Sequence, residues 1–212
     1  MPIPKVWQTE SEFVEELRLY WSSRVFARGN GEIDWPAAIN NSVKGNTFRA
    51  FRKLRRQPSR VFRDWAYDAL VLRRSLDGLS RVQSQSEYDG WLLALVEDLR
   101  KYWKHEMRVP LPFGPSYKLP NLLMKGLNER LQTAEFKGTT EFFHVALDSY
   151  TLAGVRNFIV LSDGRKIPKG ASMGFIKTEA DYQELQNGIR SLAARAGVHP
   201  IAYDYLAWDV RH

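Results

Sequence analysis

The sequence predicts an all-α fold. No segment alternates apolar and polar residues over several runs, as the strands of a β-sheet would. Apolar residues instead recur at helical spacing, and capping residues and prolines stand where helices should begin. The 212 residues, 44% of them apolar, suffice for one substantial core or two lobes with a cleft between them. We divide the chain into an N-terminal helical region, residues 1–85, and a core with C-terminal helices, residues 86–212.

The N-terminal region predicts four helices. Thr9 followed by Glu12 forms a capping box, and the helix that it opens should end at 29–31, Gly-Asn-Gly. A short helix over 35–43 has proline near its start, where proline is best tolerated. Two more helices are expected over 47–56 and 59–74, the second with Pro58 at or near its first position.

The second half of the chain continues in the same way, with one exception. Residues 139–147 are β-branched and aromatic enough for a strand or another extended segment. The remaining expectations are a helix opened by Ser86 and Asp89 and running through Trp103, a leucine-striped helix within 111–131, a helix from Asp148, a loop over 158–177, a helix from Thr178 that Gly197 ends, and a last helix from Pro200.

The chain has no cysteine, which excludes disulfides, thiolate zinc sites, cysteine nucleophiles and cysteine-ligated iron–sulfur clusters. Its four histidines, His105, His144, His199 and His212, form no set with metal-ligand spacing. We therefore expect neither a metal nor a cofactor. The start, Met-Pro-Ile-Pro-Lys, does not read as a signal peptide, and no apolar run approaches the length of a membrane span. A cytoplasmic protein with no membrane contact is the expectation.

Positive charge is concentrated in one segment, residues 44–74. This basic segment holds ten lysines and arginines and two aspartates, a net +8, so the rest of the chain sums to −1 of the total +7. Arg49, Arg52, Lys53 and Arg56 would share one face of the helix expected there. Such a face suits the phosphate backbone of a nucleic acid. We predict that these four residues bind DNA.

The stretch LPFGPSYKLPNLLMKGL, residues 111–127, places a lysine close to a helix start. Whether the helix begins at Pro115 or at Pro120, Lys118 lies within about one turn of its positive dipole end. Two explanations remain open. The side chain can bend into solvent, or its amine can be partly deprotonated and nucleophilic.

The residues before that helix suggest a hairpin. The sequence MRVPLPFGPS links an amphipathic helix to the leucine-striped one, and a helix–hairpin–helix can present backbone N–H groups to a DNA phosphate. We expect Gly114, Ser116 and Tyr117 to make this contact. Further along the chain, Asp148 either caps a helix or presents a carboxylate to a substrate, and both alternatives stay open.

LPFGPSYKLPNLLMKGL followed by HVALDSYTLAGVR resembles the helix–hairpin–helix superfamily of DNA glycosylases, best over residues 86–157. The nearest members are those like 8-oxoguanine glycosylases and the archaeal type. The resemblance implies a helix–hairpin–helix glycosylase-like bundle in which Lys118 is the nucleophile and Asp148 the catalytic aspartate. One glycine stands in the hairpin where the family usually has two.

The resemblance also implies a function. A DNA glycosylase flips a damaged or modified base out of double-stranded DNA and breaks its glycosidic bond. Asp148 would stabilise the cationic sugar, and Lys118 could form a Schiff base that allows strand cleavage, an AP-lyase activity. Phe143, His144, Tyr150 and Trp208 would line the base pocket. We expect a monomer without a small-molecule cofactor, acting in DNA repair or in defence against phages with modified DNA.

Two alternatives remain. One is a helix–hairpin–helix protein that binds DNA without catalysis, and the other is an unrelated helical module that binds RNA or an acidic protein. The presence of both Lys118 and Asp148 favours the glycosylase over a pure binding protein, which needs neither residue. The hairpin spacing favours both of these over the unrelated module.

Overall fold

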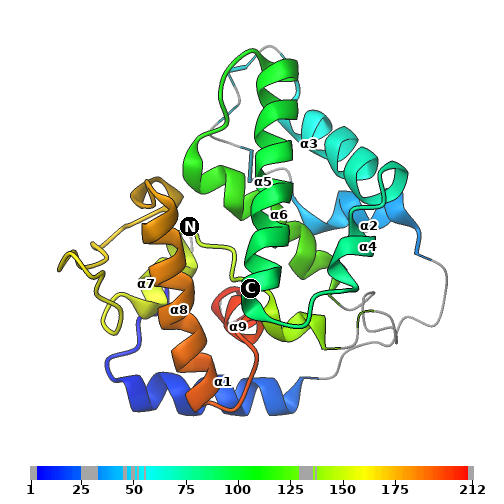
Figure 1. Cartoon of the computed structure of the whole chain (residues 1–212). Helices are drawn as coiled ribbons and strands as arrows, with labels where there is room; N and C mark the ends of the chain where they lie inside the picture. The colour runs from blue at the N-terminus through cyan, green and yellow to red at the C-terminus, as the bar shows by residue number, and fades with distance from the viewer. Residues whose placement is uncertain are drawn as a thin grey trace. The chain divides into compact units, whose positions relative to one another are not determined.

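The computed structural model describes residues 4–24, 33–44, 47–48, 51, 53–54, 56–128, 136 and 138–209. Within these residues the chain forms nine α-helices and no β-strand, which confirms the all-α prediction (Figure 1). The helices are α1 (Glu10–Ser23), α2 (Trp35–Ser42), α3 (Pro58–Tyr67), α4 (Leu76–Leu79), α5 (Gln85–Met107), α6 (Phe113–Leu127), α7 (Ser149–Val155), α8 (Glu179–Arg195) and α9 (Ile201–Asp209).

The chain divides into two compact units that do not follow the predicted boundary at residue 85. Unit 1 comprises Met1–Phe26, Phe113–Lys118 and Phe143–His212, and unit 2 comprises Ala27–Pro112 and Leu119–Phe142. The predicted boundary falls inside unit 2, because α3 and α4 pack against α5. Helix α6 contributes its first residues, through Lys118, to unit 1 and the rest to unit 2.

Unit 1 is built around an aromatic cluster. Helix α1 packs on α8 and α9, and α7 packs on α9. The rings of Trp7 and Tyr203 both lie edge-on to Phe13, with centroids 5.0 and 5.1 Å from that of Phe13. All three side chains are fully buried. Gly154 of α7 faces this cluster, and a Cβ there would meet the Tyr203 hydroxyl oxygen at 2.3 Å. The cluster therefore joins the N-terminal segment to the C-terminal helices.

Unit 2 is organised by the contact between α3 and α5. Helix α3 begins at Pro58, as predicted, and continues into a π-helical turn over Asp68–Leu72. The Trp65 indole and the Arg73 guanidinium both donate hydrogen bonds to the carboxylate of Asp98 on α5, at 2.7–2.8 Å. The pKa of Asp98 lies below its usual value, chiefly because Arg73 donates to the charged carboxylate.

Helix α6 begins earlier than the sequence suggested. Its first residue is Phe113, after an N-cap at Pro112, so the predicted starts at Pro115 and Pro120 are both wrong. Pro120 lies inside the helix and cannot donate the backbone hydrogen bond that the Ser116 carbonyl would otherwise accept. Lys118 thus sits in the second turn of a continuous helix.

Two further boundaries differ from the predictions. Helix α1, capped by Thr9 as expected, ends at Ser23 rather than at the glycines of 29–31, which lie outside the described residues. Helix α5 begins at Gln85 because Ser84 accepts the hydrogen bond from the Glu87 N–H, so the predicted start at Ser86 is wrong.

In the described residues, the segment 47–56 is not the expected α-helix, and the segment 139–147 is not a strand. Residues 47, 48 and 51 are 3-10 helical, and residues 53, 54 and 56 form turns and bends. Residues 139–142 form a 3-10 turn, and residues 143–147 belong to no described helix or strand.

Among the described helices, none combines the length and apolar character needed to cross a lipid bilayer.

Two helical glycines of unit 2 give opposite predictions for alanine substitution. Gly90 in α5 has open space around its Cβ position, so Gly90→Ala should stabilise the protein by about 0.5–1 kcal/mol through helix propensity. A Cβ at Gly126 in α6 would lie 2.7 Å from the Ser42 Cα on α2. Gly126→Ala should therefore destabilise the protein by about 1–3 kcal/mol.

Urea unfolding followed by tryptophan fluorescence measures both effects. Equal shifts of the two variants in the same direction would contradict the close approach of α2 to α6.

Candidate functional site

Lys118 and Asp148 meet in the interior of unit 1. The two residues are 30 positions apart in sequence, and Lys118 Nζ lies 3.1 Å from Asp148 Oδ2. Their side chains are only 9% and 5% exposed. The structure thus brings together the two residues predicted to be catalytic, as a nearly buried ion pair.

Asp148 is the N-cap of α7. Its Oδ1 accepts hydrogen bonds from the N–H groups of Tyr150 and Thr151 at 2.8 and 3.2 Å, and the Thr151 hydroxyl accepts one from the Asp148 N–H. The capping alternative raised by the sequence is correct, but it occupies only one carboxylate oxygen. The other oxygen faces Lys118. Capping therefore fixes the orientation of the carboxylate toward the lysine.

Side chains hold the segment 143–147, which leads to Asp148 and pairs with no strand among the described residues. Gln186 of α8 both donates to the Val145 carbonyl and accepts from the Val145 N–H, at 2.8 and 3.0 Å. Asp204 of α9 accepts from the Ala146 N–H at 2.6 Å. Both side chains are buried. Sequence reasoning missed Gln186 and Asp204; the only available signal was a polar residue on an otherwise apolar helix face.

The four predicted base-pocket residues fall into two pairs. Phe143 is fully buried, and both ring nitrogens of His144 are engaged, Nδ1 with the Tyr182 hydroxyl at 2.8 Å and Nε2 with Arg190 at 3.2 Å. This first pair is part of the core and is not available to a base. Tyr150 and Trp208 are only partly buried, and their ring centroids lie 5.1 Å apart. Since the Tyr150 N–H binds Asp148, this aromatic pair is next to the candidate site.

The predicted DNA contacts of the hairpin need correction. The Gly114 backbone packs against Met173, in the loop between α7 and α8. A Cβ added at Gly114 would lie 2.0 Å from the Met173 carbonyl oxygen. The Ser116 hydroxyl donates to the Phe113 carbonyl at 2.6 Å. The Tyr117 hydroxyl donates to Glu179, and its ring packs on Tyr182 with centroids 4.0 Å apart.

Gly114, Ser116 and Tyr117 are all buried and belong to the first turns of α6 rather than to an exposed turn. Their burial argues against direct contact with a DNA phosphate. The connection between α5 and α6 is residues 108–112, with Arg108 in the left-handed conformation. The glycine thus serves close packing inside unit 1, which its position between two prolines did not reveal.

The basic segment is more neutralised than its composition suggested. Arg49 and Arg52 lie outside the described residues, Lys53 is exposed, and Arg56 forms an ion pair with Glu106. Further ion pairs within unit 2 join Arg60 to Asp64, Arg73 to Asp68 and Asp98, and Arg74 to Asp77. Several of these acids lie outside residues 44–74, so a count within the segment could not include them. The four predicted DNA-binding residues were expected to share one face of an α-helix. The two that the structure describes, Lys53 and Arg56, lie in a turn and a bend instead.

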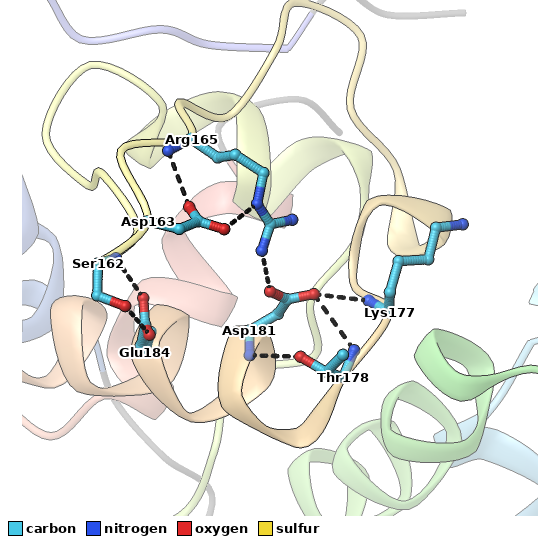
Figure 2. Close-up of polar contacts among 7 residues, drawn as sticks. All are labelled: Ser162, Asp163, Arg165, Lys177, Thr178, Asp181 and Glu184. Carbon is cyan, nitrogen blue, oxygen red and sulfur yellow. Dashed lines mark hydrogen bonds and ion pairs between the residues drawn. The ribbon is translucent and has the colours of Figure 1, made fainter.

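The loop between α7 and α8 forms a polar cluster with the first two turns of α8 (Figure 2). Arg165 forms ion pairs with Asp163 in the loop and with Asp181 on α8. Asp181 also accepts hydrogen bonds from the N–H groups of Lys177 and Thr178, at 3.0 and 3.2 Å. At the other end of the loop, the Ser162 N–H and hydroxyl both donate to Glu184, at 2.7 and 2.6 Å. The loop is therefore fastened to α8 at both ends.

Neither of two well-defined surface pockets contains the ion pair. One, of about 380 Å³ in unit 2, is lined by Arg56, Arg60 and Tyr102 among others. The other, of about 460 Å³ in unit 1, lies along α8 between Glu10, Val160 and Arg195. In the described part of the chain, no three His, Asp or Glu side chains converge as metal ligands would.

Comparison with protein-family models, curated proteins and solved structures finds no match to this chain.

The buried ion pair predicts strong coupling between its two members. Asp148→Asn keeps the helix cap but leaves the Lys118 ammonium buried without a carboxylate, so it should cost about 3–5 kcal/mol of unfolding free energy. Adding Lys118→Met removes the stranded charge and should recover much of that loss. A double-mutant cycle from urea unfolding measures the coupling, and additive effects of the two substitutions would show that the pair is absent in solution.

The contacts that Asp181 makes with the loop predict that the stability of the protein depends on pH. Burial alone would raise the pKa of Asp181, but hydrogen bonds from backbone N–H groups, first that of Lys177, and from Arg165 outweigh it and hold the pKa below its usual value. A depressed folded pKa contributes stability that is present above about pH 4 and is lost as the pH falls through the folded value.

Asp181→Asn should therefore lower the thermal unfolding midpoint at neutral pH, and the difference from the wild type should shrink below about pH 4. Thermal unfolding of both proteins across this range makes the comparison. A difference that stays constant down to about pH 2 would mean that Asp181 does not titrate as an anchored carboxylate.

Proposed function

We propose that the protein is a DNA glycosylase that excises a damaged or modified base, with Asp148 and Lys118 as its catalytic residues. The observation that carries this proposal is the 3.1 Å contact between a nearly buried lysine and a nearly buried aspartate from distant parts of the chain. Double-stranded DNA is the proposed partner, and repair or defence against phages with modified DNA is the proposed role.

A buried ion pair is poorly explained by stability alone. Removing two charges from water costs several kcal/mol per ion, and apolar residues of similar size often serve a core equally well. Several buried polar groups also hold Asp148 in place. Its own carboxylate caps α7, and two buried polar side chains, from α8 and α9, bind the backbone of the segment 143–147 that leads to it. Such an arrangement is typical of a site that positions reactive groups.

Asp148 suits the stabilisation of a sugar cation. Breaking a glycosidic bond develops positive charge on the sugar, and a fixed carboxylate near C1′ lowers the energy of that state. Oδ1 is held by the α7 N–H groups, so Oδ2 can serve the reaction without loss of orientation. The partly exposed rings of Tyr150 and Trp208 offer a surface on which a flipped base could stack.

Lys118 suits nucleophilic attack at the same carbon. Asp148 first takes a proton from the Lys118 ammonium and leaves a free amine at Nζ. The amine forms the C1′–N bond as the bond to the base breaks, and the departing base takes the bonding electrons and the proton from Asp148. Asp148 then takes a second proton, from the substituted amine, whose lone pair opens the sugar ring. O4′ leaves with its electrons and takes that proton, and a protonated imine remains between C1′ and Nζ. Because the pair is nearly covered, a nucleotide reaches it only after the covering side chains move.

Borohydride trapping tests the proposal. The protein is incubated with a panel of modified duplexes and modified phage DNAs, and reduction of the imine should yield a covalent protein–DNA adduct. Lys118→Gln should abolish the adduct, whereas Lys125→Gln, a lysine change in the last turn of the same helix, should leave it intact. Asp148→Asn should slow base release by at least roughly 10²-fold, because the charge that stabilises the sugar cation is lost.

Unimpaired excision by Asp148→Asn would end its catalytic assignment. Excision by Lys118→Gln, together with a wild type that gives no adduct, would instead make water the nucleophile and leave Lys118 a positioning residue.

A DNA-binding protein without catalysis is the second candidate. The observation that favours it is the burial of the pair and its absence from both surface pockets. Salt-dependent duplex binding, with no abasic sites formed on any DNA of the panel, would support this candidate over the glycosylase.

A further inference from the structure

We propose that the loop Leu161–Thr178, termed the basic loop, is a surface of unit 1 that contacts the phosphate backbone of DNA. This inference deepens the proposed function, on which it rests for the identity of the polyanion. The segment was expected to be a loop, and the structure confirms this, with a short 3-10 turn at Met173–Phe175.

The first argument is the availability of positive charge. The basic loop holds Arg165 and three lysines, Lys166, Lys169 and Lys177, but only one acid, Asp163. Arg165 forms ion pairs with Asp163 and with Asp181 of α8, so neither of these acids neutralises a lysine of the loop. The three lysines are exposed, and none of them forms an ion pair with any residue that the structure describes.

This distinguishes the basic loop from the basic segment of residues 44–74. There, Arg56, Arg60, Arg73 and Arg74 already pair with acids of unit 2. A phosphate must compete with a carboxylate for such arginines, whereas the lysines of the basic loop have only water and counterions to release. The three lysines of the loop can therefore bind a polyanion without displacing a carboxylate.

The second argument is preorganisation. Figure 2 shows that Arg165 and Ser162, near the start of the basic loop, bind Asp181 and Glu184 of α8. At the end of the loop, the N–H groups of Lys177 and Thr178 bind Asp181. Gly164 and Gly170 supply backbone turns with φ of 82° and 79°. Buried apolar side chains anchor the stretches between these contacts: Leu161, Ile167, Ala171 and Ile176. A backbone fixed in this way loses little conformational entropy when it binds a ligand.

The third argument is position. The Met173 carbonyl of the basic loop packs directly on Gly114 in the first turn of α6. Lys118 follows about one helical turn later. The loop is therefore in contact with the element that carries the proposed nucleophile, and a DNA strand held by the loop would be held close to that helix.

The chemistry of the basic loop favours a nucleic acid over a membrane. Surfaces that bind lipid usually combine basic residues with exposed large apolar side chains that enter the bilayer interface. Among the described residues, Leu161–Thr178 contains no strongly exposed large apolar side chain, and Val160 lies just before it. Charged tips on a fixed backbone instead suit a row of phosphates.

The test compares two triple variants that remove the same charge. Lys166, Lys169 and Lys177 are replaced together by Ser in one, and Arg81, Lys101 and Lys104 in the other. All six residues are exposed, and none forms an ion pair with a residue that the structure describes. Fluorescence anisotropy gives the affinity for an unmodified duplex between about 50 and 200 mM salt. The loop variant should reduce the slope of log K against log salt by about 2–3, and the control variant should leave it nearly unchanged.

Equal reductions in both variants would show that net charge alone drives binding and would overturn the proposal. So would an unchanged slope in the loop variant with circular dichroism like that of the wild type. Loss of binding to phosphatidylserine vesicles, with duplex binding retained, would assign the loop to membranes instead.

The two proposals fail separately. Adduct formation on a modified duplex by a protein whose loop variant binds DNA normally would leave the glycosylase standing without the loop. A reduced salt slope, with no excision on any substrate, would leave the loop standing without the glycosylase.

Discussion

The organisation of unit 1 depends on satisfying the backbone of one segment, residues 143–147. These residues are buried and pair with no strand in the described part of the chain, so their N–H and C=O groups require partners from elsewhere. Gln186, Asp204 and Thr151 provide them from three different helices. These contacts fix the point at which α7 begins, and the cap of α7 is Asp148. The carboxylate next to Lys118 is thus a result of backbone hydrogen bonding on both sides of it.

Much of the fold followed from local signals. Capping residues such as Thr9 and Thr178, and prolines at helix starts, marked helices that the structure confirms. Lys118 and Asp148 were also identifiable, because a lysine close to a helix start and an aspartate after an apolar run are both conspicuous. Their contact across 30 residues was not a local property, and only the motif resemblance paired them before the structure did.

The failures have a common physical origin in contacts between distant segments. Gly114 looked like a hairpin glycine, but the carbonyl that requires it lies at Met173, far along the chain. The basic segment looked unbalanced because Glu106 and Asp98, which pair with its arginines, are on α5. Gln186 and Asp204 looked like ordinary polar helix residues until their backbone partners were known. In each case the role of the residue depends on a contact with a residue far away in sequence, which a local sequence pattern does not contain.

The division of the chain has a consequence for how the protein is made. Unit 1 takes residues from both ends of the chain and a short piece of α6, with all of unit 2's segments lying between them in sequence. Helix α1 is synthesised before all the segments of unit 2, yet it packs on α8 and α9, which are synthesised after them. The apolar face of α1 cannot be buried until α8 and α9 have been synthesised. Until then, Trp7 and Phe13 cannot pack against Tyr203. Unit 2, completed at residue 142, has its segments available earlier, so co-translational folding should begin there.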